Sequence, residues 1–260
     1  LLSNSPDFSK FLESISLKFG NDTDLNVWLL SPLSERIIHN PLYKYFCFIK
    51  TIESLHKEKS SCAFMVEEQW IKEYFQQFLP EIKILLNSNK IQFKSFFIIR
   101  LKLAYYFFLK ISQLFIAKSF IKKINFQNKE ITLIERFALP NFYEKDRYFT
   151  RIEEFAPSHI NLVFCPSFVH TNIFQSFFAF KEIEKSNKVF LFKEHYLSIQ
   201  DIISSFYKSL TLKKILNQNN ELNELERILL LGSYKKITSF SSSIEAHINF
   251  KFINRLKHLR

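Results

Sequence analysis

Short apolar runs alternate with longer helical patterns along almost the whole chain. Most of these runs lack the apolar–polar alternation of a half-exposed strand and are typical of strands covered on both faces: Leu25–Leu30, Cys62–Val66, Ile82–Leu86, Ile131–Glu135, Asn161–Cys165 and Lys188–Phe192. Helical patterns lie between and after them, near residues 40–57, 67–79, 91–122, 171–186, 198–210, 221–231 and 240–259. Strands that alternate with helices form βαβ units with parallel strands. The pattern therefore predicts an α/β fold with a doubly wound, mainly parallel sheet.

The length of 260 residues suits one large domain or two small ones. No internal repeat, low-complexity block or linker rich in Pro and Ser divides the chain. We therefore expect a single α/β domain over residues 1–260, with C-terminal helices in residues 221–260 after a surface loop at residues 217–220. The chain begins with Leu1 and stops inside a basic helical pattern, so we expect a fragment of a longer protein.

Glycine is scarce, since Gly20 and Gly232 are the two glycines of the chain. A phosphate-binding P-loop needs two glycines shortly before a lysine, and a dinucleotide fingerprint needs three close together, so neither motif is present. Cys47, Cys62 and Cys165 are odd in number and widely spaced, which argues against a disulfide framework and a zinc site. The sequence therefore predicts a cytosolic protein without a metal or another cofactor.

The net charge of +11 is concentrated in two segments. Residues 81–125 carry nine basic residues and one acidic residue, and the last ten residues carry four basic ones. The long helix near residues 91–122 has two interpretations: an aromatic, basic helix on an anionic membrane surface, or a crossover helix that packs its apolar stripe inward, as such stripes usually do. The inward residues would be Phe97, Leu101, Phe108 and Phe115. Nucleic acid is not expected as a partner, because no nucleic-acid-binding module is present.

No segment is expected to cross a membrane. The longest stretch without Lys, Arg, Asp or Glu, residues 155–180, contains two prolines, two histidines and two asparagines, and basic residues interrupt the apolar residues 91–124. Charged side chains also interrupt the opening residues, which argues against a signal peptide. We therefore expect a cytoplasmic protein, at most peripheral to the inner face of a membrane.

Polar side chains gather where the predicted strands end, which is where an open parallel sheet binds its ligands. They are Ser31, Glu35 and Arg36 after the first strand, Glu135 and Arg136 after the fourth, His170 after the fifth, and Lys193, Glu194 and His195 after the sixth. Lys193, Glu194 and His195 either bind an anionic ligand or form a solvated end of the strand. The same two interpretations apply to Glu35 and Arg36. His170 is either a general base, since imidazole titrates near neutral pH, or part of a helix start for which Thr171 is a suitable N-cap.

Asp146, Arg147 and Tyr148 lie in the long loop after the fourth predicted strand. An Asp–Arg pair can orient a sugar hydroxyl or hold a phosphate through the planar guanidinium group. The alternative is an ion pair that only closes the loop. No spacing of His, Cys, Asp and Glu is typical of a metal site.

Four stretches, in order, resemble the N-terminal half of bacterial surface-carbohydrate biosynthesis proteins, the sugar transferases of O-antigen, lipopolysaccharide and capsule pathways. They are residues 27–55 (VWLLSPLSERIIHNPLYKYFCFIKTIESL), residues 131–149 (ITLIERFALPNFYEKDRYF), residues 162–168 with 188–203 (LVFCPSF and KVFLFKEHYLSIQDII), and residues 245–260 (EAHINFKFINRLKHLR). The resemblance covers most of the chain and depends on the order and spacing of these stretches.

This resemblance implies the acceptor-side domain of a glycosyltransferase, one of two facing Rossmann-like halves. The nucleotide-sugar donor would bind mainly to the second half, beyond Arg260, and Asp146, Arg147 and Tyr148 would line the cleft between the halves. Asp146 and Arg147 would orient a hydroxyl of a lipid-linked or other glycan acceptor, with His170 or Glu35 as the base. The fragment alone is then expected to be inactive. The alternative function is a non-catalytic or decayed interaction domain at the membrane periphery.

Overall fold

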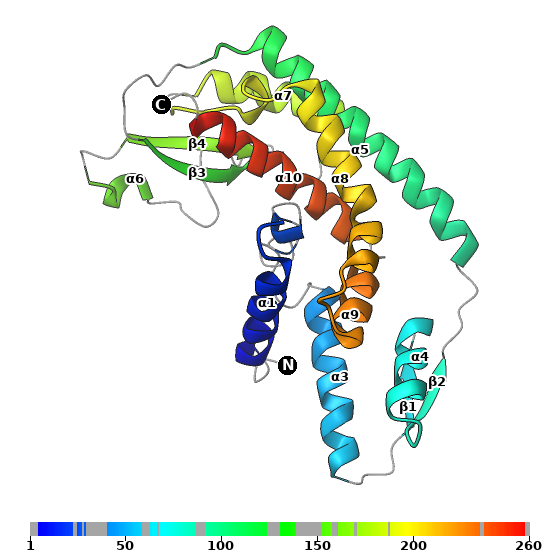
Figure 1. Cartoon of the computed structure of the whole chain (residues 1–260). Coiled ribbons are helices and arrows are strands. Elements are labelled where there is room, and N and C mark those ends of the chain that lie inside the picture. The colour runs from blue at the N-terminus through cyan, green and yellow to red at the C-terminus, as the bar shows by residue number, and fades with distance from the viewer. Residues whose placement is uncertain are drawn as a thin grey trace. The chain divides into compact units, whose positions relative to one another are not determined.

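The computed structural model describes residues 5–22, 25–27, 29, 41–58, 63–66, 68–86, 92–123, 131–138, 152–157, 161–168, 171–186, 188–234 and 237–257 (Figure 1). These residues belong to two compact units. Unit 1 comprises Leu1–Leu103 and Ser205–His247, and unit 2 comprises Ala104–Ser204 and Ile248–Arg260. Three helices continue from one unit into the other: α5 (Gln92–Phe120), α8 (Ile199–Gln218) and α10 (Ile237–Lys257). The expectation of a single domain over residues 1–260 stays a prediction.

Unit 1 is mainly helical. Its elements are α1 (Ser5–Phe19), α3 (Pro41–Lys57), β1 (Ala63–Val66), α4 (Gln69–Phe78), β2 (Lys83–Leu86) and α9 (Glu224–Tyr234), together with parts of the three shared helices. β1 and β2 pair in parallel, with α4 as their connection. Its core is formed by apolar side chains from most of these helices, including Ile15, Leu42, Ile52, Phe75, Leu216 and Leu229.

The two glycines serve the local structure of unit 1. Gly20 follows the end of α1 with φ of +53°, a conformation that glycine adopts without strain, and its N–H bonds the Ser16 and Leu17 carbonyls. Gly232 on α9 lies under the ring of Trp70, where a Cβ atom would come within 2.4 Å of the Trp70 Cζ2 atom. Both positions therefore require glycine for local structure.

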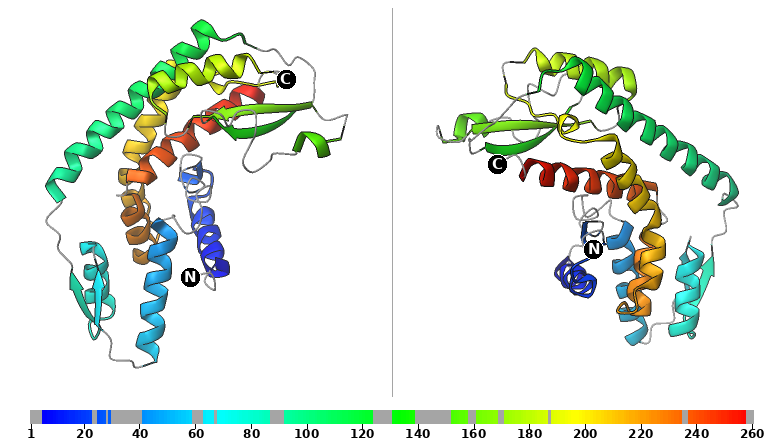
Figure 2. Two further views of the ribbon diagram at one scale, coloured as in Figure 1. Left: turned by 180° about the vertical axis from the view of Figure 1, so that it is seen from behind. Right: turned by 45° about the horizontal axis from the view of Figure 1, so that its top comes forward.

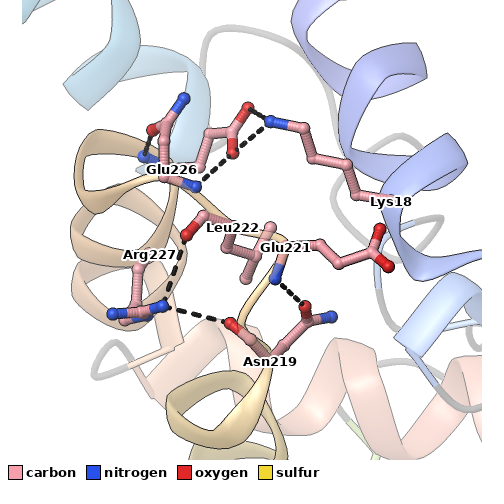
Figure 3. A network of polar contacts seen from close by, with 7 residues as sticks. Lys18, Asn219, Glu221, Leu222, Glu226 and Arg227 are labelled. Atoms are coloured by element: carbon pink, nitrogen blue, oxygen red, sulfur yellow. Dashed lines mark hydrogen bonds and ion pairs between the residues drawn. The ribbon is translucent and has the colours of Figure 1, made fainter.

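A polar network ties the start of α9 to α1 and to the end of α8 (Figure 3). Both Glu226 carboxylate oxygens accept from Lys18 Nζ, at 2.6 and 2.7 Å. Asn223 and Glu226 also bond each other's backbone N–H groups, which is a capping box. The Arg227 guanidinium donates to the carbonyls of Asn219 and Leu222, so it satisfies acceptors at the turn between the two helices.

Unit 2 contains the second parallel pair of strands. Its elements are β3 (Ile131–Phe137), α6 (Ile152–Phe155), β4 (Asn161–Ser167), α7 (Ile173–Glu184) and the short 3₁₀ helix η3 (Lys193–His195). β3 and β4 are in register from the pair Ile131–Asn161 to the pair Phe137–Ser167. The core packs these strands against α7 and the end of α5 (Figure 2), with Ala117, Ile134, Phe164, Phe180, Ile183 and Phe192 among its residues.

The C-terminal half of α10 is held in unit 2 by polar contacts. Asp201, at the start of α8, forms ion pairs with Arg255 at 3.3 Å and Lys251 at 3.7 Å. Ser198 caps α8, and Asp201 accepts hydrogen bonds from both the Ser198 backbone and its hydroxyl. Burial would raise the pKa of Asp201, but these hydrogen bonds and the two cations outweigh it, so the pKa lies below its usual value.

The predicted doubly wound, mainly parallel sheet is wrong. Among the described residues, 71% are helical, and the strands form two separate two-stranded sheets. Residues 25–27 and 29 of the first predicted strand are helical, and the Asp22 carboxylate accepts from Leu25 N–H at this helix start. The sixth predicted strand is reduced to one bridge between Phe190 and Phe164. The physical reason is that a short apolar run suits a buried helix as well as a strand.

Candidate functional site

Seven of the twelve predicted site residues lie outside the described residues, and their roles stay predictions: Ser31, Glu35, Arg36, Asp146, Arg147, Tyr148 and His170. Near His170, the N-cap of α7 is Asn172 and not Thr171. Asn172 and Gln175 bond each other's backbone N–H groups at 2.8 and 3.0 Å. The start of α7 is therefore satisfied by its own capping box.

Three of the other predicted residues, Glu135, Lys193 and Glu194, lie close to the thiol of Cys165. Burial, with a smaller contribution from the carboxylates of Glu194 and Glu135, raises the pKa of Cys165 to about 12 against the opposing effect of Lys193. This thiol therefore stays protonated at neutral pH and is not an activated nucleophile. Arg136 pairs with Pro166 in the sheet register.

Lys193 and Glu194 belong to the interior of unit 2. Their side chains are only 3% and 4% exposed, and Lys193 Nζ donates to Asn249 Oδ1 at 3.1 Å. The interpretation of these residues as a solvated strand end is therefore wrong. Their position links η3 to α10, which is a structural contact.

His195 bonds the end of α5. Its Nε2 atom lies 2.9 Å from the Ala117 carbonyl oxygen and 3.1 Å from that of Ile121. Because a carbonyl can only accept, Nε2 carries the proton in these contacts. His195 thereby gives the Ala117 carbonyl, which also accepts from the Ile121 N–H, a second donor, and it bonds the Ile121 carbonyl just after the end of α5.

An open cavity of about 220 Å³ lies between α3 and α4 of unit 1, lined by Glu53, His56, Lys57, Tyr74, Phe78 and Leu79. Burial, together with the charges of Glu53 and Glu224, raises the pKa of Tyr74 to about 12. The phenol is therefore protonated at neutral pH and does not act as a base there.

The outer face of α5 carries exposed apolar side chains. Apolar side chains recur there at spacings of three, four and seven residues, which places them on one side of the helix. We call this set the α5 stripe: Ile98, Leu101, Tyr105, Phe108 and Phe115. Each of these side chains is between 46% and 63% exposed. The prediction that Leu101, Phe108 and Phe115 pack inward is therefore wrong; Phe97 lies at a position whose side chain is outside the description.

Basic residues border the α5 stripe on both sides. At about 100° per residue, Arg100 and Lys118 lie along one edge and Lys102 along the other, and all three are exposed. Residues 82–129 contain no Asp or Glu. The outer face of α5 thus combines an apolar strip with cations only.

The opposite face of α5 accounts for the packing of the helix in unit 2. Leu114 and Ala117 are buried, and Gln113 Nε2 donates to the Ser176 hydroxyl of α7 at 3.0 Å. α7 lies alongside this half of α5 in Figures 1 and 2. The helix therefore has two apolar faces, of which only the inner one is covered within the described residues.

No group of three or more His, Cys, Asp or Glu side chains in the described residues is arranged to hold a metal ion. No helix in the described ranges is both long and apolar enough to cross a bilayer.

Comparisons of the whole chain with protein-family models, curated proteins and solved structures give no significant match.

Proposed function

We propose that the chain is a non-catalytic, membrane-peripheral module that binds anionic membrane surfaces through the α5 stripe. The observation that carries the proposal is the exposure of five large apolar side chains on one face of a helix bordered only by basic residues. A helix with this arrangement lies in the membrane interface, with its apolar face among the upper acyl chains and its cations at the phosphates.

Two contributions favour such binding. Complete burial of one large apolar side chain contributes about 1.5–3 kcal/mol. The α5 stripe has five such side chains, each of them partly exposed. Each basic residue near an anionic surface contributes about 1 kcal/mol more, and Arg100, Lys102 and Lys118 are placed for this. The anionic, cytoplasmic leaflet expected from the sequence supplies the matching charge.

The sugar-transferase interpretation stays a prediction. Asp146, Arg147, His170 and Glu35, its expected catalytic residues, lie outside the described residues, and the Rossmann-like half that it implies is not the fold of the described residues. A nucleotide-sugar donor and a lipid-linked acceptor remain its expected ligands. Asp146→Asn in the full-length gene tests it directly, since that change should abolish the surface polysaccharide.

The membrane proposal is tested by sedimentation of the chain with vesicles. We expect binding to vesicles of phosphatidylcholine and phosphatidylglycerol, and a loss of affinity of about a hundredfold or more for Phe108→Glu/Phe115→Glu, because two apolar groups become charged. The matched control is Leu17→Glu/Phe155→Glu, which adds the same charge at two exposed apolar residues of α1 and α6.

High salt should weaken the binding, since it screens the lysines. A wild-type chain that does not sediment with anionic vesicles at low salt would overturn the proposal. So would a control pair that loses as much affinity as the α5 pair.

A further inference from the structure

The cavity between α3 and α4 is lined by a tyrosine whose hydroxyl has no partner. Tyr74 of α4 is only 7% exposed. Its ring packs against those of Phe75 and Phe78, at centroid distances of 5.3 and 4.9 Å. Its hydroxyl, in contrast, makes no hydrogen bond to any of the described residues. Because polar groups at buried positions are normally hydrogen-bonded, this hydroxyl is available to a molecule that enters the cavity.

The same cavity is lined by charges of both signs. Glu53 and Lys57 lie one turn apart on α3, yet no ion pair joins them. Instead, the Glu53 Oε2 atom accepts from Lys50 Nζ at 2.9 Å. Lys57 is exposed and forms no ion pair with a described residue. One anionic and one cationic side chain therefore line the cavity without neutralising each other.

The groups around the cavity strengthen its attraction for a cation. The Glu81 carboxylate lies 3.9 Å from His56. Burial and the charges of two carboxylates, one of them Glu224 of α9, raise the pKa of Tyr74. The lining residues also lie at the C-terminal ends of both α3 and α4, where the carbonyl groups of a helix favour positive charge. An ammonium group is therefore favoured near the phenol.

Aromatic and apolar side chains complete the lining. The faces of the Tyr74 and Phe78 rings attract a cation, and Phe78, which is 43% exposed, supplies apolar surface together with Leu79. The volume of about 220 Å³ is below the range of about 300–1,000 Å³ that is usual for drug-sized ligands. A ligand with few heavy atoms and a short apolar body therefore fits the cavity.

We infer that this cavity binds a small zwitterion of the amino-acid type, with its ammonium group against Glu53 and the Tyr74 phenol oxygen and its carboxylate at Lys57. A purely cationic ligand would be repelled by Lys57, and a purely anionic ligand by Glu53, whereas a zwitterion pairs with both. Its apolar body packs against Phe78 and Leu79. This inference does not depend on membrane binding through the α5 stripe.

Isothermal titration calorimetry on the whole chain tests the class of ligand. The probes are L-leucine, isoamylamine and isocaproate, which share the same branched apolar body. Isoamylamine lacks the carboxylate of L-leucine, and isocaproate lacks its ammonium group. L-Leucine should bind about tenfold or more tightly than either of the other two, because each of them loses one charge-assisted contact.

Two variants should distinguish the two ends of the ligand. Glu53→Gln should weaken the binding of L-leucine and isoamylamine by about tenfold and should not weaken that of isocaproate. Lys57→Gln should weaken the binding of L-leucine and isocaproate by about fivefold and should not weaken that of isoamylamine. Tyr74→Phe, which keeps the ring, should weaken the binding of L-leucine by about fivefold. A substitution that only disturbed the folded chain would affect all three probes alike.

Glu13→Gln and Lys10→Gln, at exposed positions of α1, are the matched charge controls and should bind L-leucine as the wild type does. The inference is overturned if the wild type binds none of the probes, or if isoamylamine binds as tightly as L-leucine. Equal losses in the controls and the cavity variants, or equal losses for all three probes in each cavity variant, would also overturn it. None of these results changes the expected vesicle binding through the α5 stripe, so the two proposals fail separately.

Discussion

The inner and outer faces of the helices in unit 2 are similar in composition and opposite in environment. On α5, Leu114 is 2% exposed and its neighbour Phe115 is 54% exposed. On α7, Phe180 is fully buried and Phe178 is 63% exposed. Both faces carry large apolar residues, so hydrophobicity alone does not distinguish a core face from a binding face.

Charge distinguishes the two faces. The outer face of α5 is bordered by cations alone, whereas charged groups on the inner side have defined protein partners, as Lys193 has in Asn249 and Asp201 has in Arg255. A large apolar patch on a solvent-exposed face usually marks an interaction site. The comparison therefore predicts that substitutions inside affect folding and substitutions outside affect binding.

The largest expected effect comes from the neighbours Leu114 and Phe115. Leu114→Ala should lower the free energy of unfolding by about 2–5 kcal/mol, because it leaves a cavity in a packed interior. Phe115→Ala should change it by less than about 0.5 kcal/mol, as at other exposed positions. Urea denaturation followed by circular dichroism measures both. Equal losses of unfolding free energy would show that the outer face is covered in the folded chain. The contrast between the two faces would then be wrong.

Charge neutralisation on the outer face should have the next largest effect. Lys102→Gln/Lys118→Gln should weaken binding to anionic vesicles by about fivefold for each lysine, since each contributes about 1 kcal/mol near such a surface. Lys10→Gln/Lys57→Gln, at exposed positions of α1 and α3, makes the same change in net charge. An equal loss in the control pair would mean that total charge, and not the α5 face, drives the binding.

Local structure can be predicted from the sequence where the length of an apolar run and its composition indicate the same type of element. The predicted runs at Cys62–Val66, Ile82–Leu86, Ile131–Glu135 and Asn161–Cys165 all contain strands, and the helix predicted near residues 91–122 is α5. How the strands associate depends on long-range contacts that spacing does not encode. Four strands therefore form two pairs and not the one predicted sheet.

The candidate surface follows from the sequence only in part. The run of basic residues without acidic ones suggests the membrane alternative for α5. Helical spacing, however, cannot distinguish a covered apolar stripe from an exposed one. It therefore predicts that Leu101 packs inward, whereas the side chain is exposed. The exposed aromatic face of α7 was not predicted, although a signal exists. Phe174, Phe178 and Lys181 share one face, while the opposite face has Ser176 and Ala179, small residues that allow close packing against a neighbouring helix.

The smallest expected effect is a loss of folding stability at acidic pH. It again distinguishes the inner side of unit 2 from its outer face. The folded pKa of Asp201 lies below its usual value, which is about 3.9 for an unfolded chain. The resulting stabilisation is therefore complete above that unfolded pKa and is lost as the pH falls through the folded one. Lysines keep their charge over this range, so vesicle binding should not be lost in step with this stabilisation.

Asp201→Asn isolates this effect. The variant should melt below the wild type at neutral pH, because it loses the ion pairs with Arg255 and Lys251, and the two melting temperatures should converge as the pH falls below the folded pKa of Asp201. Thermal denaturation at a series of pH values measures the convergence, and vesicle sedimentation at the same pH values measures binding. A constant difference between the two proteins would mean that the carboxylate charge does not hold α10. Binding that weakens in step with the melting temperature would mean that the inner contacts also support the outer face.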